Sequence, residues 1–296
     1  MAGETTVLFA VDAGTVGLTP DDQVLANAVR RRGLSVRPVV WSSSSTADDV
    51  VLIRSPYDYV ERPAEFRSWL DDLDECGATV LNSTSLLRWN MHKGYLTDLA
   101  ARGVAVVPTE MLTQGSTRSL TDLLADRGWS RVVVKPAIGA SARQTISVEG
   151  ADAASLASAD AHLRRLVERE DVLVQPFIAS IETDGEVSVV AIGGEITHAV
   201  LKRPTVGEWR VQSDFGGSAV RVPVTAEHER AVSSVLGAVD GAPTYARVDL
   251  VGIDGELHLM ELELIEPELF FQIAPEAADR LAGCLVDRQP GLVLPG

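Results

Sequence analysis

The sequence has 296 residues, of which 46% are hydrophobic and 23% charged, and this composition excludes a disulfide-stapled miniprotein, a collagen-like repeat and a disordered chain. At roughly 100–200 residues per domain, the length predicts two or three packed units. The formal net charge of −16 makes nucleic acid and anionic membranes poor partners, because both require a basic surface.

Cysteine usage and the start of the chain predict the compartment. Cys76 and Cys284 lie far apart and in no metal-binding spacing, which fits a reducing cytoplasm. The first residues lack the basic segment of a signal peptide, and no apolar run approaches the roughly 20 residues that span a bilayer. We therefore expect a cytoplasmic protein.

Strands and helices are predicted to alternate in the first part of the chain. Apolar runs predict strands at 7–11, 36–41, 50–53 and 78–81, and amphipathic stretches predict helices at 21–33 and 64–76. This order is typical of a parallel sheet.

The rest of the chain changes character. Helices are expected at 91–102, 120–126 and 153–170, and strands at 131–136 and 171–178. Two antiparallel hairpins, at 186–202 and 245–264, flank a helix at 226–239. The predicted fold class is therefore an α/β domain followed by α+β units.

The strongest local signal for chemistry is the segment 258–267, HLMELELIEP. Side chains alternate faces along a strand, so Glu261 and Glu263 project together from one face. Hairpin pairing can bring Asp249 near Glu261. Three converging carboxylates would form a hard-oxygen site suited to Mg²⁺, which also shares ligands with phosphates. The alternative is an exposed sheet face with solvated acids.

Lys135 closes the apolar run 132–134 and precedes a loop of small and hydroxyl residues, 139–145, that includes Ser141. Such a lysine either lies at a strand edge with its amine in solvent or directs a positive charge at a phosphate. The backbone N–H groups of the loop could approach phosphate oxygens. The loop matches neither a Walker A nor a G-x-G-x-x-G pattern, so it defines no site by itself.

Two further segments carry candidate ligand-binding residues. The strand end at Gln175, Phe177 and Ile178 could hold a purine, with a nearby carboxylate for ribose hydroxyls; otherwise it is a simple strand end and turn. The other candidates are basic residues, each an ordinary surface charge when taken alone: Lys202, Arg210 and Arg247. Beside the carboxylates, these cations favour a site for a metal and a triphosphate.

Taken in order, these motifs resemble those of the ATP-grasp superfamily. They are Lys93 ahead of the segment 103–109, then VVVKP with its loop, VQPFI, DGE, LKRP, RVDL and ELELIEP. The resemblance covers most of the chain and is closest to glutathione-synthetase-like members, whose last motif is E-x-N with a proline four residues after the asparagine. Here Pro267 lies four residues after Glu263, which replaces the asparagine and adds negative charge. The loop after Lys135 also has fewer glycines than is typical.

The resemblance implies an ATP-grasp fold, with ATP and one or two Mg²⁺ as cofactors. An N-terminal parallel βαβ substrate domain would span 1–90. A central subdomain at 91–178 and a C-terminal subdomain at 179–296, which carries the metal site, would clasp the ATP.

The resemblance also implies roles for individual residues. The residues that bind ATP would be Lys93, Lys135, Ser141, Gln175, Phe177, Ile178 and Glu186. The metal ligands would be Asp249, Glu261 and Glu263. The catalytic cations, which would face the γ-phosphate or an acyl phosphate, would be Lys202, Arg210 and Arg247.

Substrate recognition is expected mainly in the N-terminal unit and in the segment after Arg203. Ligands bind at the carboxyl ends of strands in open α/β sheets, and the residues that follow strand ends in the N-terminal unit are Asp12, Arg54, Ser55, Pro56, Tyr57 and Tyr59. Arg54 is the first candidate to hold a substrate carboxylate bidentately; the alternative is an ordinary surface arginine.

The implied activity is ATP-dependent carboxylate–amine ligation. A carboxylate attacks the γ-phosphate to give an acyl phosphate and ADP, and an amine then displaces phosphate. We expect a small amino-acid-like substrate. Many members of the superfamily are homodimers, and the sequence leaves a homodimer or a monomer open. Within the superfamily, the chain is similar to the cycloserine synthetase type, which implies cyclisation of O-amino-D-serine to D-cycloserine in antibiotic biosynthesis.

Two alternatives belong to other functional classes. A phosphotransferase on the same fold would act as a small-molecule kinase, but it would need a strongly basic pocket, which a net charge of −16 disfavours. A nucleotide-binding module without catalysis is disfavoured by the intact carboxylates at Asp249, Glu261 and Glu263.

Overall fold

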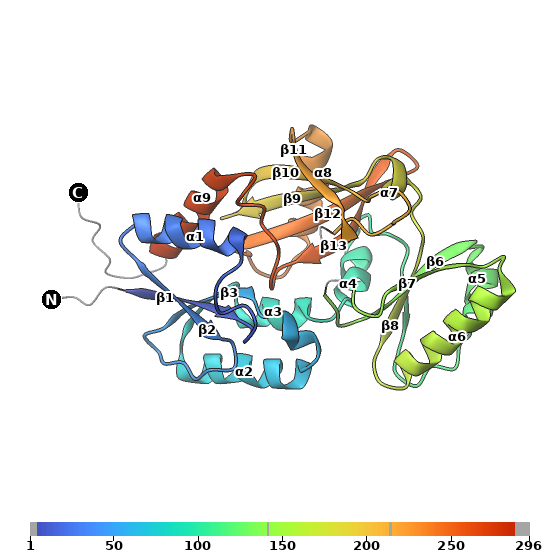
Figure 1. The fold of residues 1–296 in the computed structure, drawn as a ribbon, viewed down its shortest axis with the longest axis horizontal. Helices are drawn as coiled ribbons and strands as arrows, with labels where there is room; N and C mark the ends of the chain where they lie inside the picture. The colour runs from blue at the N-terminus through green and yellow to red at the C-terminus, as the bar shows by residue number, and fades with distance from the viewer. Residues whose placement is uncertain (1–4, 141, 213–214, 288–296) are drawn as a thin grey trace.

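The computed structural model describes residues 5–140, 142–212 and 215–287, which form three β-sheets with helices packed around them (Figure 1). The strand orders are β2-β1-β3-β4, β5-β8-β6-β7 and β11-β10-β9-β12-β13. The first sheet is parallel and the pairings of the other two are antiparallel. The predicted order, an α/β unit followed by α+β units, is confirmed.

The first sheet is covered on both faces. Its strands are β1 (Thr6–Val11), β2 (Ser35–Val40), β3 (Val50–Ser55) and β4 (Thr79–Leu81), and its helices are α1 (Pro20–Arg31) and α2 (Pro63–Cys76). Along β1, Val7 and Phe9 pack with α1, whereas Leu8 and Ala10 pack with α2. A strand buried on both faces needs apolar residues at successive positions, which explains the run at 7–11.

Local signals set the ends of these two helices. The Thr19 hydroxyl accepts a hydrogen bond from the backbone N–H of Asp22 and begins α1, with Pro20 at its first position. Gly77 ends α2 in the left-handed conformation, with φ at 77°.

The second sheet lies at one end of the molecule (Figure 1). Its strands are β5 (Glu110–Leu112), β6 (Arg131–Pro136), β7 (Ile146–Glu149) and β8 (Val172–Pro176), and its helices are α5 (Leu120–Arg127) and α6 (Ala153–Val167). Val132 and Val134 of β6 face the helices and form a separate core with them. Lys135 alternates to the other face, because it lies one position further along the strand.

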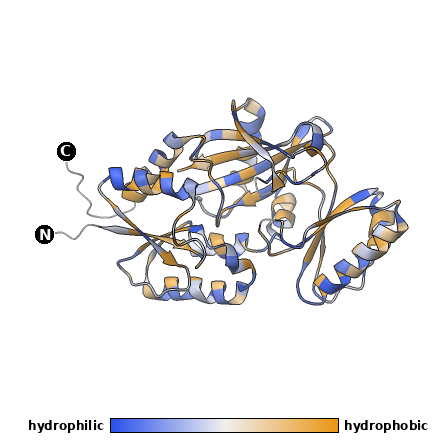
Figure 2. Ribbon diagram, viewed as in Figure 1, coloured by the Kyte–Doolittle hydropathy of each residue, from blue (hydrophilic) through white to orange (hydrophobic). Residues whose placement is uncertain are grey.

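The third sheet is the largest. Its strands are β9 (Glu186–Ile192), β10 (Glu195–Arg203), β11 (Ser218–Val222), β12 (Tyr245–Ile253) and β13 (Glu256–Glu263), with α7 (Ser180–Thr183) before them and α8 (Ala226–Gly237) after β11. Its strands carry hydrophobic residues interrupted by hydrophilic ones in Figure 2, and α2 and α6 also carry both kinds.

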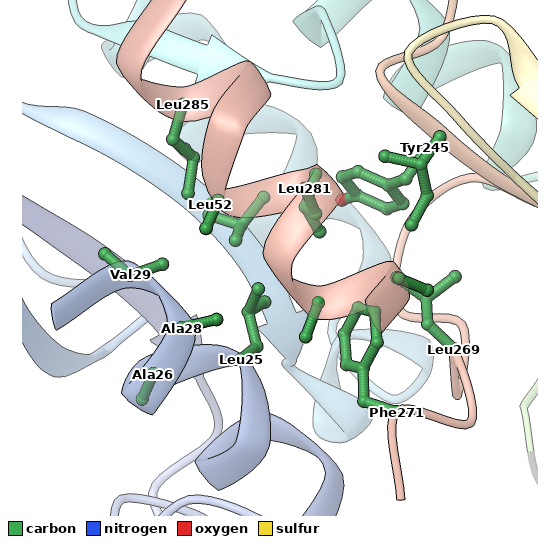
Figure 3. Close-up of a cluster of buried hydrophobic side chains, with 14 of the residues drawn as sticks. Leu25, Ala26, Ala28, Val29, Leu52, Tyr245, Leu269, Phe271, Leu281 and Leu285 are labelled. Atoms are coloured by element: carbon green, nitrogen blue, oxygen red, sulfur yellow. The ribbon is translucent and has the colours of Figure 1, made fainter. Parts of the chain in front are cut away.

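The last helix, α9 (Pro275–Asp287), joins the third sheet to the first unit. Leu281 and Leu285 of α9 lie in one buried cluster with Leu25 and Val29 of α1, and Figure 3 shows these side chains between the two helices. Tyr245 of β12 belongs to the same cluster and contributes to it from the third sheet. The first and third sheets therefore share one core.

Several elements differ from the prediction. The helix expected at 91–102 is shorter, α4 (Tyr95–Ala101), and it is preceded by an unpredicted helix, α3 (Thr84–Asn90), which Ser83 caps. The single turn η1 (Tyr57–Val60), the short strand β7, the exposed strand β11 and helix α9 were not predicted.

The sheets fall inside the three expected domains, at residues 6–81, 110–176 and 186–263. The domain boundaries at 90 and 178 stay predictions, and helices α3 and α4 pack on the third sheet. Within the described part of the chain, no helix has both the length and the apolar character needed to cross a membrane.

Candidate active site

All three sheets contribute to a cavity of about 710 Å³. Arg54 and Tyr59 come from the first unit, Lys135 and Gln175 from the second, and Glu261 from the third. A cavity of this size with convergent charged groups is the default place for a ligand.

The chain has only three lysines, and every one of them lines this cavity: Lys93, Lys135 and Lys202. The remaining positive charge of the sequence is arginine. The cavity wall also carries arginines and carboxylates, so the lysines lie in a mixed field of both signs. Their compact, strongly hydrated ammonium groups are the cations that a polyphosphate could contact there.

Lys93 and Lys135 both line the cavity but differ in whether a described carboxylate pairs with them. The Lys93 amine pairs with Glu261 at 2.7 Å and donates to the Gly139 carbonyl at 2.9 Å. Burial disfavours its charge, but Glu261 outweighs burial and raises the pKa of Lys93. Lys135 forms no ion pair with any described residue, and burial lowers its pKa. An anion bound in the cavity would compensate Lys135.

Lys202 and Arg247 form a buried network with acids of the third sheet. Lys202 pairs with Glu186 at 2.5 Å and with Asp249 at 3.2 Å. Arg247 bridges Asp249, at 3.0 Å, and Glu263. Burial raises the pKa of Glu186, and it also raises the pKa of Glu263, to about 8.

The predicted carboxylate trio is only partly brought together. Asp249 pairs opposite Glu261 in the strand register, as predicted, and Glu261 and Glu263 both line the cavity. Asp249 does not line it, because its carboxylate is engaged by Arg247, Lys202 and the Ser188 hydroxyl. Burial opposes the charge of Asp249, but Arg247 and Lys202 outweigh burial and lower its pKa.

Within the described ranges, no group of three His, Cys, Asp or Glu side chains is arranged to hold a metal ion without other ligands. Two carboxylates are nevertheless a suitable donor set for Mg²⁺, which commonly takes one or two protein carboxylates and completes its shell with phosphates and water. Glu261 and Glu263 fit that requirement.

The predicted adenine segment also lies on the cavity wall, at Gln175, Phe177 and Ile178. Gln175 is buried and donates from its side-chain amide to the Thr109 hydroxyl at 2.9 Å. The Arg131 guanidinium stacks over the Phe177 ring at 3.4 Å from its centroid. These contacts fix an apolar wall of the kind that a flat base packs against.

The remaining predicted residues occupy different positions. Arg210 lines the cavity, held by Glu208 at 2.6 Å. Ser141 lies outside the described residues. Asp12 does not line the cavity and accepts a hydrogen bond from Thr15. Tyr57 lines it, and the residue is 40% exposed.

Arg54 reaches the cavity wall, but its side chain is nearly fully engaged by the protein. Its Nε donates to Asp22 at 2.7 Å and its Nη2 to the Pro267 carbonyl at 3.2 Å. Nη1 is buried without a partner in the structure. The guanidinium is 2% exposed and joins the first unit to the segment after β13. Only Nη1 is left for a substrate carboxylate, which does not suit the bidentate contact that we predicted.

We expect Arg54→Met to lower the free energy of unfolding by about 3–5 kcal/mol, because it leaves Asp22 buried without its counter-charge. Chemical denaturation monitored by tryptophan fluorescence measures this. The double variant Asp22→Asn with Arg54→Met is the control, and it is expected to recover part of the loss because it removes the stranded charge. An unchanged stability in Arg54→Met would contradict the structural role.

Glu266 is a residue of this site that carried no predicted role, and it lies beside Tyr59, one of the predicted strand-end residues. Tyr59 hydrogen-bonds Glu266, and both line the cavity. Burial raises the pKa of Glu266 to about 7. The segment 258–267 already contained this third glutamate, directly before Pro267, but strand alternation ends at Glu263 and gave no direction for its side chain.

Family models match the two parts of the chain. Residues 99–275 match the model described as prokaryotic glutathione synthetase, ATP-grasp domain. The chain belongs to the ATP-grasp family. Residues 7–82 match a second model, described as D-cycloserine synthetase DcsG, N-terminal domain. The fold, the cavity and the order of its motifs agree with this assignment.

Individual relatives of this ATP-grasp protein cover nearly the whole chain. The cycloserine biosynthesis protein DcsG of Streptomyces lavendulae is 30% identical, over 95% of this chain and 97% of that protein. The glutathione synthetase of Parasynechococcus marenigrum (strain WH8102) is 27% identical, over 93% of this chain and 82% of that protein.

Solved structures give the same assignment. The crystal structure of D-cycloserine synthetase DcsG superposes with a TM-score of 0.85 at 27% identity, covering 96% of this chain and 99% of that one. A D-alanine–D-alanine ligase from Bacillus anthracis shares the fold, with a TM-score of 0.66 at 17% identity over 96% and 97% of the two chains. This chain is an ATP-dependent ligase, and ATP-grasp ligases generally use ATP with Mg²⁺.

Proposed function

We propose that this ATP-grasp ligase cyclises O-amino-D-serine to D-cycloserine, with ATP as the activating cofactor. The observation that carries the proposal is the match of residues 7–82 to the N-terminal domain of DcsG, because this domain is the part expected to read the substrate. The similarity to DcsG along 95% of the chain supports it.

Lys93 and Lys135 would bind the phosphates of ATP. Lys135 supplies a cation that no described acid pairs, and Lys93 supplies a second one fixed by Glu261. The adenine would pack at Gln175, Phe177 and Ile178, and Glu186 would take the ribose. Ser141 stays a candidate for the phosphates from the loop after Lys135.

Glu261 and Glu263 would hold Mg²⁺, with Asp249 supporting them through Arg247. Bound there, the metal would neutralise charge on the phosphates. The replacement of the usual asparagine by Glu263 adds a negative charge, which the contact with Arg247 compensates.

The protein's own part in the reaction would be positioning and charge neutralisation. A carboxylate oxygen of the substrate attacks the γ-phosphorus, and the bond to the bridging oxygen breaks to release ADP. The aminooxy nitrogen then attacks the acyl carbon, the carbon–oxygen bond to phosphate breaks, and the nitrogen loses a proton. Arg210 and Lys202 would face the charge that develops on the phosphoryl group.

The test is a product balance with purified protein, ATP, Mg²⁺ and O-amino-D-serine. We expect ADP, inorganic phosphate and D-cycloserine in equal amounts. Release of ADP with another amino acid but not with this one would refute the substrate while keeping the ligase. A stable phosphorylated product without free phosphate would favour the kinase alternative, and ATP binding without turnover would favour the binding module.

The proposal includes a small amino-acid-like substrate, a homodimer and a cytoplasmic location. The net charge of −16 supports the absence of nucleic-acid and membrane partners. Sedimentation velocity of the purified protein tests the homodimer.

A further inference from the structure

Glu266 on the cavity wall lacks the ion pair that four neighbouring carboxylates have. Asp21 of the same wall also forms no ion pair with a described residue, but it accepts the backbone N–H groups of Leu269 and Gln272. Four carboxylates there are paired with cations: Asp22 with Arg54, Glu186 with Lys202, Glu261 with Lys93, and Glu263 with Arg247. Glu266 lines the same cavity and forms no ion pair with any described lysine, arginine or histidine. Its carboxylate accepts hydrogen bonds from the Tyr59 hydroxyl and from its own backbone N–H.

The backbone around Glu266 is fixed from both flanking units. The Tyr245 hydroxyl donates to the Ile265 carbonyl at 3.1 Å, and Arg54 donates to the Pro267 carbonyl at 3.2 Å. Two residues further on, Asp21 accepts from the Leu269 N–H at 3.3 Å. A carboxylate presented on such a constrained segment is preorganised, so it loses little freedom when it binds a ligand.

Tyr59 orients the Glu266 side chain. Its ring is buried against Phe66, with the centroids 4.8 Å apart, and it is 4% exposed. Its hydroxyl satisfies only part of the accepting capacity of Glu266, because a carboxylate has about four lone-pair sites. The remaining sites are available to a donor that enters the cavity.

The chemistry of that donor follows from charge. A half-buried carboxylate without an ion pair is costly. Burial outweighs the charge of Lys93, which forms its ion pair with Glu261, and raises the pKa of Glu266 to about 7. A ligand that carries a positive charge removes this cost, whereas a phosphate or a carboxylate increases it. The lysines serve the anionic end of the substrates, so Glu266 is placed to serve a cationic end.

We propose that Glu266, oriented by Tyr59, binds the α-ammonium group of the amino-acid substrate and makes the enzyme select α-amino acids. The inference rests on the proposed function for the identity of the substrate. It adds a specificity-determining residue from the segment after β13, beyond the N-terminal strand ends where substrate contacts were expected.

The experiment compares two substrates that differ only in this group. O-amino-D-serine carries the α-ammonium, and 3-(aminooxy)propanoic acid lacks it but keeps the carboxylate and the nucleophile. ADP release gives kcat/KM for both. We expect the wild-type enzyme to prefer the amino acid by about 10- to 100-fold, the range of one charged hydrogen bond. Glu266→Gln should lower kcat/KM for the amino acid by that factor, mainly through KM, and leave the des-amino acid within about twofold.

Two further variants sharpen the comparison. Tyr59→Phe removes the hydroxyl that orients Glu266 and should weaken the preference only in part. Glu276→Gln is the matched control, because Glu276 pairs with Arg221 and does not line the cavity. It should behave as the wild type.

The outcomes separate the two proposals. If the wild type releases no ADP with either acid, the proposed function fails. If it turns over both acids equally, or if Glu266→Gln lowers kcat/KM for both by the same factor, the ammonium site is refuted while the ligase activity stands. Circular dichroism of Glu266→Gln shows whether an equal loss comes from unfolding.

Discussion

Lys135→Met is expected to lower kcat/KM for ATP by about 10³-fold, because the cavity loses the one lysine that forms no ion pair with a described residue. The other two lysines are held by Glu261 and Glu186, so neither can replace it. Methionine fills a similar volume without the charge. Initial rates of ADP release at several ATP concentrations measure the effect.

Lys135→Arg is the matched control, since it keeps the charge and should retain more activity than the methionine variant. A second readout uses the composition of the chain. With only three lysines, all on the cavity wall, amine acetylation followed by mass spectrometry reports directly on this site. ATP should protect Lys135 from the reagent. Full activity in Lys135→Met, or labelling that ATP does not change, would contradict the assignment.

The sequence predicted the elements that bury a continuous apolar pattern. The strands at 7–11 and 131–136 and both hairpins of the third sheet were found because their periodicity is strong. Strand alternation also placed Glu261 and Glu263 on the cavity face, as the structure has them. Motif order gave the superfamily, and the comparisons confirm it.

What the sequence could not give depends on contacts between distant residues. β11 is largely exposed and is held by backbone pairing with β10, so no apolar pattern marked it. The sequence predicted that Arg54 is a free cation at a strand end, but Asp22 on α1 neutralises it. The resemblance implied that Asp249 is a metal ligand, whereas in the structure its carboxylate oxygens pair with buried Arg247 and Lys202. Arg247 lies two residues before Asp249 on β12, but Asp22 and Lys202 lie on other elements than their partners, and spacing along the chain carries no information about those pairs.

Glu261→Gln tests whether the carboxylates on β13 serve the nucleotide. The amide keeps the shape of the side chain and can still accept from Lys93, so the fold should persist. The negative charge that would hold Mg²⁺ is lost, and we expect kcat/KM for ATP to fall by roughly 10²–10³-fold. Rates measured across a range of Mg²⁺ concentrations check this.

A control variant on the same strand shows whether the loss of any negative charge on β13 has this effect. Glu256→Gln lies on the same strand but is exposed at its start, outside the cavity, and is expected to match the wild type. If Glu261 holds the metal, its variant should need more Mg²⁺ to reach half-maximal rate, and the Glu256 variant should not. An unchanged Mg²⁺ requirement in Glu261→Gln, with thermal unfolding as in the wild type, would remove Glu261 from the metal site and leave it as the partner of Lys93 alone.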